Sequence, residues 1–152
     1  ASALGLQAQT PAFKERRDDG FRRVEAKQLE AAEALFEEVR QAARATSDLR
    51  AEAEAHRGKA RVRGERRDFQ GAKDELEEAL RLFEQGRDPL GVGNVRNARG
   101  IVAWSEGDWP RVREEFEAAS AAVTPMLAVA VAPQGTSPIR FMTRMKTKVL
   151  SR

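Results

Sequence analysis

Apolar side chains recur through the middle of the chain with the period of an α-helix. One stripe at positions i, i+3, i+4 and i+7 consists of Leu76, Ala79, Leu80 and Phe83. Glu75, Glu77, Glu78 and Glu84 lie beside this stripe, and residues 35–43 show a similar alternation. The pattern predicts amphipathic helices, each of which must bury one face against a neighbour.

The pattern repeats at a spacing of 40 residues. Each unit carries a small residue in its first half and four further matched positions in its second half. The matched columns are Gly20, Ala60 and Gly100; Leu29, Phe69 and Trp109; Ala32, Ala72 and Val112; Phe36, Leu76 and Phe116; and Val39, Ala79 and Ala119. Such units stack side by side, because one unit cannot bury its apolar face alone.

Start and stop signals divide each unit into two helices. Thr10-Pro11 is typical of a helix start, and Asp48, Asp68, Asp88 and Asp108 can each cap a following helix. The expected helices are about 11–25, 28–43, 49–65, 69–85, 89–106 and 109–122. We therefore predict an all-α fold, an α-solenoid of about three antiparallel helix pairs with an atypical C-terminal capping segment. The predicted parts are an N-terminal tail (1–10), a repeat domain (11–124, with units of about 11–46, 47–86 and 87–124) and a basic C-terminal cap or tail (125–152).

The C-terminal segment differs in charge from the rest of the chain. The net charge is +3, but no acidic residue follows Glu117. Residues 125–152 carry five basic side chains, so the remaining chain is slightly acidic. Residues 126–132 predict either one buried helical turn or an extended segment, and Ser137-Pro138 can open a short basic amphipathic helix. This segment could cap the repeats, assemble with a second copy, or bind an anionic surface.

The repeat resembles the tetratricopeptide repeat (TPR) family. The closest stretch is 91–119, where Gly100, Gly107-Asp108-Trp109, Phe116 and Ala119 match the signature spacing. Units one and two match it at the columns above, and the resemblance covers about residues 11–122. The long period is similar to that of TPRs in large bacterial signalling and transcription regulators. The resemblance implies a scaffold that binds a partner protein or peptide, with first helices lining a concave groove that is basic and second helices forming an acidic outer face.

Two positions in each first helix depart from the family pattern. Large apolar residues are expected there, but the chain has Arg16 and Asp19, His56 and Lys59, and Arg96 and Arg99. Charged groups are rarely buried without a partner. Either these helices are rotated, with Val62, Val95, Ala98 and Val102 facing inward, or the long side chains reach out to solvent along their stems.

Position in the resembled family selects the candidate partner-binding residues. They are Arg17, Arg57, Arg61, Asn94, Asn97, Ile101 and Trp104. An asparagine amide both donates and accepts, so it can hold a peptide backbone, and arginine can clamp a carboxylate. These chemistries favour an extended or helical peptide of acidic character. The alternative is that the arginines only form exposed pairs with Glu54 and Glu65.

Other chemistry has little support in the sequence. There is no cysteine, His56 is the sole histidine, and no phosphate-binding or dinucleotide motif occurs. Glutamates such as Glu75, Glu77 and Glu78 are interpreted as a solvated face. We expect no enzyme activity, no metal, no cofactor and no small-molecule substrate. Residues 1–10 lack signal-peptide features and no apolar run reaches the ~20 residues that span a bilayer, so a cytoplasmic location is expected.

Overall fold

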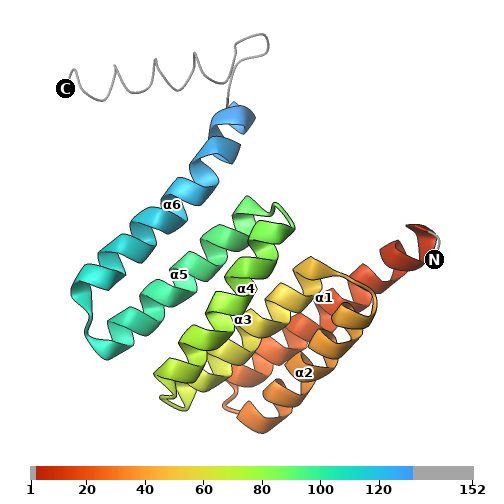
Figure 1. The fold of residues 1–152 in the computed structure, drawn as a ribbon. Helices are drawn as coiled ribbons and strands as arrows, with labels where there is room; N and C mark the ends of the chain where they lie inside the picture. Colours follow the sequence, from red (N-terminus) through yellow and green to blue (C-terminus); the bar gives the residue numbers. More distant parts are fainter. Residues whose placement is uncertain (1–2, 132–152) are drawn as a thin grey trace.

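The computed structural model describes residues 3–131, with side chains for residues 12–126, and within this range the chain is entirely helical (Figure 1). Its helices are α1 (Ala3–Glu25), α2 (Leu29–Ala45), α3 (Leu49–Glu65), α4 (Phe69–Gln85), α5 (Pro89–Glu106) and α6 (Trp109–Val131). The predicted all-α class is confirmed. Between the first and last described turns, the helix boundaries agree closely with those predicted from the capping residues.

All five connections between the helices have the same geometry. One residue in each adopts a left-handed conformation, and these residues are Lys27, Ser47, Arg67, Arg87 and Gly107. In the α3–α4 connection, the N–H of Arg67 donates to Gly64 O and that of Asp68 to Arg63 O. This is the Schellman arrangement, which satisfies carbonyl groups left over at the end of a helix. It recurs every 20 residues.

The residue after each left-handed position starts the next helix. Asp48, Asp68, Asp88 and Asp108 each accept a hydrogen bond from the backbone N–H three residues ahead, at 2.9–3.2 Å. The first connection differs, because Gln28 makes no side-chain cap. Each aspartate therefore both closes one helix and caps the next, so the connections are short and neighbouring helices are antiparallel (Figure 1).

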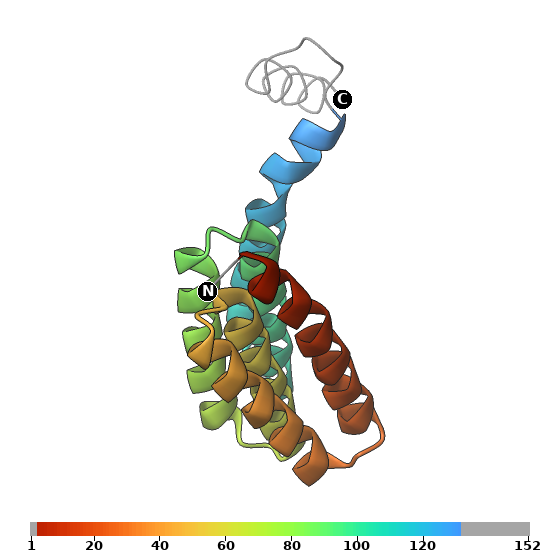
Figure 2. The ribbon, with the colours of Figure 1, turned by 90° about the vertical axis from the view of Figure 1, so that its right-hand side faces the viewer.

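The odd-numbered and even-numbered helices form two different rows. Every helix packs on its neighbours in sequence, and α3 also contacts both α1 and α5. In the described part of the chain, the even-numbered helices make no such contacts with one another. Figure 2 shows α1 on one side and α2 and α4 on the opposite side. The odd-numbered helices are thus the closely spaced layer, and the even-numbered ones are splayed apart.

A tight contact around Phe36 holds the first helices together. Phe36 of α2 is fully buried. A Cβ atom added at Gly20 of α1 would lie 2.7 Å from its ring, and one added at Gly58 of α3 would overlap the ring. The prediction that a small residue permits close approach is borne out here, and again where Gly100 of α5 meets Phe116 of α6. Larger side chains at these positions would push the helices apart.

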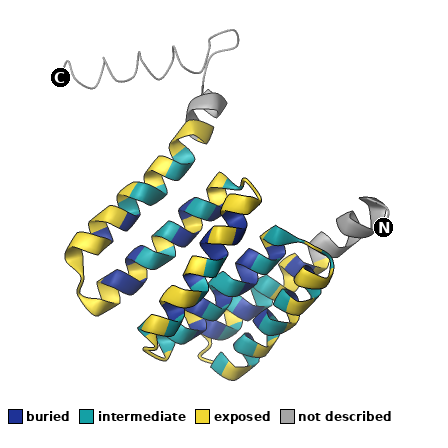
Figure 3. Ribbon diagram, viewed as in Figure 1, coloured by how far each residue is buried: buried dark blue, intermediate teal, exposed yellow. Residues whose placement is uncertain are grey.

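Two features account for the charged residues at positions of the first helices where the resembled family has large apolar ones. The helices are rotated, and most of the charged side chains form ion pairs. Figure 3 shows buried residues along α3 and α5. Val62, Val95 and Val102 are among the buried residues of these helices, as expected if the helices are rotated.

In the second and third units the charged side chains meet carboxylates of the following helix. In the first unit Arg16 is exposed, and Asp19 pairs with Arg22 and Arg23 of its own helix. Lys59 lies 3.3 Å from Glu75, and Nδ1 of His56 lies 2.6 Å from the same carboxylate.

Two glutamates are therefore interior parts of the fold. Glu75 was interpreted as part of a solvated face, and this was wrong: its side chain is 12% exposed and joins α4 to α3. Glu115 of α6 is 1% exposed and lies 3.3 Å from Arg96 and 3.1 Å from Arg99. A buried carboxylate needs such partners to offset the loss of hydration. Periodicity along one helix could not reveal them, because the partners belong to another helix.

Both ends of the described chain differ from expectation. α1 begins at Ala3, so Pro11 lies inside the helix and not in its first turn. Residues of high helix propensity before Pro11 are consistent with this extension. α6 passes Pro125 and ends at Val131, and the hydroxyl of Thr124 donates to Ser120 O just before the proline. Met126 is exposed and not buried. The expected short helix after Pro138 lies outside the described residues.

Two glycine substitutions should test the turn geometry. Gly64 lies in α3 and Gly107 has a φ of 77°, and an added Cβ meets nothing within 4 Å at either site. We expect Gly64→Ala to raise the free energy of unfolding by about 0.5–1 kcal/mol through helix propensity. Gly107→Ala should lower it by about 1 kcal/mol, because alanine is strained at positive φ. Denaturant unfolding of both variants would measure the change in the free energy of unfolding. An equal change in the two variants would contradict the expected strain at Gly107.

Ion pairs within and between helices should make the fold sensitive to acid. Hydrogen bonds from Arg40 hold the pKa of Glu37 well below its usual value, against the opposing effect of burial. Burial raises the pKa of Glu75, but His56 and Lys59 together bring it below its usual value. A lowered pKa contributes stability that is present above the unfolded-state pKa and lost as pH falls below it.

We therefore expect the free energy of unfolding to decline below about pH 5. Glu37→Gln should make that decline shallower, because it removes one of the responsible groups. Glu38→Gln, at the exposed neighbouring position, is the control and should leave the decline unchanged. Urea unfolding of the three proteins between pH 3 and pH 7 measures the free energy of unfolding. If it declines equally with pH in Glu37→Gln and in the parent, Glu37 is not one of the groups responsible.

Candidate partner-binding groove

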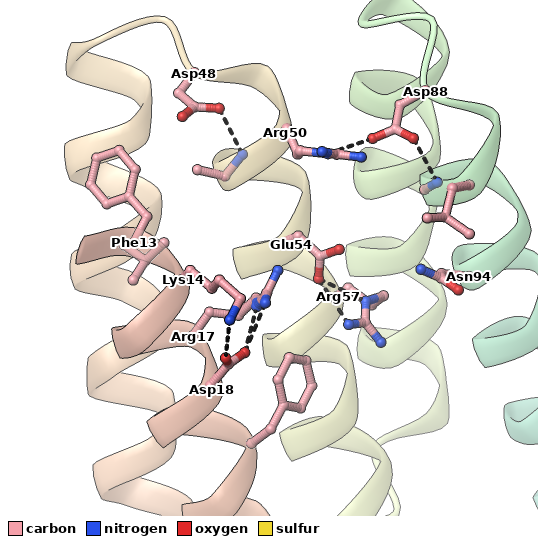
Figure 4. A pocket seen from close by; sticks show the side chains of 15 residues that line it. Phe13, Lys14, Arg17, Asp18, Asp48, Arg50, Glu54, Arg57, Asp88 and Asn94 are labelled. Atoms are coloured by element: carbon pink, nitrogen blue, oxygen red, sulfur yellow. Dashed lines mark hydrogen bonds and ion pairs between the residues drawn. The ribbon is translucent and has the colours of Figure 1, made fainter. Parts of the chain in front are cut away.

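The closely spaced layer of odd-numbered helices carries two adjoining hollows. Hollow A, of about 470 Å³, lies across α1, α3 and the start of α5. Figure 4 shows that its labelled side chains come from α1 at one side, α3 in the middle and α5 at the other side. Its lining includes Phe13, Lys14, Arg17, Asp18, Phe21, Arg50, Glu54, Arg57, Asp88 and Asn94.

Hollow B, of about 530 Å³, continues toward the other end of the same helices. Its lining includes Phe21, Arg57, Arg61, Glu65, Arg67, Phe69, Asn94, Asn97, Ile101 and Ser105. Phe21, Arg57 and Asn94 line both hollows. We therefore treat hollows A and B as one feature, called the groove below.

The groove brings together most of the residues that the sequence selected. Six of the seven candidates line it, namely Arg17, Arg57, Arg61, Asn94, Asn97 and Ile101. Trp104 lines neither hollow. Its side chain is 60% exposed, one helical turn beyond Ile101 on α5. Its ring packs edge-on against that of Trp109, with ring centres 5.0 Å apart.

One face of α5 is open to solvent along the groove. Asn94, Asn97, Ile101 and Trp104 are all exposed and follow one another at helical spacing. Among the described residues, the side-chain amides of Asn94 and Asn97 make no hydrogen bond with the protein. Two amides and two large apolar groups are therefore available on the same face, which is a suitable surface for a peptide.

The arginines of the groove are partly neutralised by their own helices. Arg57 lies 2.8 Å from Glu54, and Arg61 lies 3.6 Å from Glu65. These are the pairs that the alternative interpretation of the sequence expected. Arg57 also lies over the ring of Phe21, 4.8 Å from its centre. Pairing holds these guanidinium groups in place at the groove surface, and it also reduces the net positive charge they offer.

Hollow A is close to neutral in formal charge. Arg17 donates to Asp18, whose pKa is lowered by that bond against a smaller opposing effect of burial. Asp88 of the α4–α5 connection accepts from Arg50 at 2.7 Å. Burial raises the pKa of Asp88, but the N–H of Gly91 and Arg50 together bring it below its usual value. The formal charges of these two ion pairs cancel.

Hollow B retains positive charge. Three arginines and one glutamate line it, and the glutamate is shared. Glu65 bonds to Lys27 at 2.5 Å, which lowers its pKa, as well as facing Arg61. Arg67 is exposed, and among the described residues it makes no ion pair. The expected basic inner surface is therefore confined to this half of the groove.

Sequence reasoning missed Arg67 and Phe69 as groove residues. The guanidinium carbon of Arg67 lies 5.5 Å from the centre of the Phe69 ring. Arg67 is the left-handed residue of the α3–α4 connection, so its side chain projects beside the end of α3. The one available signal was its place immediately before the capping Asp68. Without the backbone geometry, that signal did not indicate where the side chain would lie.

The described residues contain little that would support other chemistry. Over the range 3–131 no group of three histidine, aspartate or glutamate side chains is arranged to hold a metal ion. His56 lies between helices, hydrogen-bonded to Glu75, and outside the groove. Of α1 to α6, none is both long and apolar enough to cross a membrane.

Comparison with known proteins gave no relatives. The chain matches no protein-family model, no curated protein and no solved structure.

Proposed function

We propose that this chain is a TPR-like scaffold that binds a segment of a partner protein in the groove. In this proposal the helices form an α-solenoid of three antiparallel pairs, and the odd-numbered helices are its concave layer. The contacts of α3 with α1 and α5, without matching contacts between even-numbered helices, support that curvature. The 20-residue recurrence of one turn geometry supports the repeat.

The observation that carries the proposal is the unused face of α5. Exposed amides at Asn94 and Asn97 lie beside the exposed apolar groups of Ile101 and Trp104. A peptide backbone can exchange hydrogen bonds with the amides while its side chains contact the apolar groups. Large exposed apolar side chains rimmed by polar ones are typical of interaction sites.

Binding without catalysis is part of the proposal. Most of the charged groups that line the groove are engaged in ion pairs, which suits recognition better than proton transfer. A cysteine-free chain is compatible with the cytoplasm, where we propose that the protein acts.

A random peptide library displayed on phage would test the proposal. We expect the protein to select peptides, and we expect Asn94→Ala/Asn97→Ala to weaken their binding about tenfold, since each lost hydrogen bond is worth about 0.5–1.5 kcal/mol. Gln70→Ala removes an amide from α4, outside the groove, and should leave binding unchanged. Circular dichroism should show that all variants keep their helical content.

The outcome is decided by where the selected peptides bind. Peptides whose affinity is the same for the parent and for the double asparagine variant would contradict groove binding. So would a protein that selects no peptide but binds anionic vesicles or DNA through residues 125–152. That result would favour the basic C-terminal segment as the functional part.

A further inference from the structure

We infer that hollow B and the adjoining exposed face of α5 are built to receive an acidic, apolar segment of the partner, with a carboxylate seated at Arg67 and Arg61 and a bulky apolar side chain against Ile101 and Trp104. This inference rests on the proposed function and adds the chemistry of the ligand. It also assigns Arg67, which the sequence did not single out, to the binding surface. Hollow A has no comparable preference, since its charges are balanced.

The charge balance within hollow B supports a binding position for a carboxylate at Arg61 and Arg67, which together with Ile101 and Trp104 is called the seat below. Glu65 serves both Lys27 and Arg61, so it cannot neutralise a further cation. Arg67 is exposed, and its guanidinium carbon lies 5.5 Å from the centre of the Phe69 ring, within the range of a cation–π contact. An arginine that pairs with no carboxylate of the described residues is suited to a bidentate ion pair with an incoming one.

The apolar half of the seat lies across the hollow on α5. Ile101 lines hollow B and is 45% exposed, and Trp104 follows it with 60% of its surface exposed. The edge-on contact between Trp104 and Trp109 limits the rotation of both rings, so little side-chain freedom is lost when a ligand binds. Aromatic side chains with few rotatable bonds and ordered arginines are the residues that dominate binding energy at protein interfaces.

Together these features select the ligand by charge complementarity. A basic or uncharged segment would leave the Arg67 guanidinium without a partner. A segment with only acidic side chains would leave the apolar surface of Ile101 and Trp104 exposed to water. An amphipathic segment with glutamate and leucine on one face satisfies both halves. The occupant to which we commit is therefore an acidic amphipathic peptide of a partner protein.

Two synthetic peptides would test this chemistry directly. One is a tryptophan-free helical peptide with glutamate and leucine at i, i+3 and i+4, and the other replaces every glutamate by glutamine. Trp104 and Trp109 are the two tryptophans of the chain, so intrinsic fluorescence reports binding at the seat. We expect the acidic peptide to bind at least tenfold more tightly than the glutamine peptide, with an affinity that falls as salt rises.

The turn geometry offers a matched control for Arg67. Arg67 and Arg87 are both exposed arginines in the left-handed position of equivalent connections, with φ of 62° and 52°. Arg87 lines neither hollow. Arg67→Gln should reduce the affinity for the acidic peptide about three- to tenfold and leave the glutamine peptide unaffected, whereas Arg87→Gln should change neither. Thermal unfolding of both variants would establish that they fold equally well.

Failure of this inference can be told apart from failure of the proposed function. If phage-selected peptides depend on Asn94 and Asn97 but show no preference for acidic residues, the groove binds partners and the inferred chemistry is wrong. Equal binding of the two synthetic peptides, or equal effects of Arg67→Gln and Arg87→Gln, also overturns the inference. So does a single-stranded oligonucleotide that binds the seat more tightly than the acidic peptide.

Discussion

The connection between helices is the constraint on which the described structure depends. In four of the five connections an aspartate bonds back to the end of one helix through its N–H and caps the next helix through its carboxylate. Because one residue both ends a helix and caps the next, the connection is too short to let the direction of the next helix vary. The recurrence of this geometry every 20 residues makes successive helices antiparallel and returns every second helix to the same layer.

Packing between the helices uses two kinds of contact in alternation. Close approach through small residues, as where Phe36 meets Gly20 and Gly58, brings the odd-numbered helices together. Ion pairs from Glu75 and Glu115 join charged first-helix side chains to the second helices. The charged contacts contribute less stability than apolar ones would, because each requires the removal of hydration water. They do, however, restrict how one helix can be rotated against the next.

The position of the groove follows from where these contacts lie. The contacts that stabilise the fold lie mainly between the two rows of helices, so the face of the odd-numbered helices that carries the groove remains exposed to solvent. Its charged groups differ along its length: those of hollow A are paired, whereas Arg67 in hollow B makes no ion pair with another described residue. Exposed apolar side chains lie toward both ends of α5, with Leu90 in hollow A and Ile101 and Trp104 toward hollow B. The two halves of the groove therefore differ in charge and not in apolar character.

The positions of the helices could be predicted from the chain of residues alone, because capping and periodicity are local properties. Six of the seven candidates chosen from the TPR resemblance also line the hollows. Three features became visible only in the folded chain: Glu75 and Glu115 are interior, α1 begins before Pro11, and Arg67 lines hollow B. A glutamate on a helix has the same sequence context whether it faces water or a neighbouring lysine, so its role is set by a partner far away in the chain. The left-handed turn at Arg67 likewise aims a side chain in a direction that residue identity does not specify, because non-glycine residues seldom adopt that conformation.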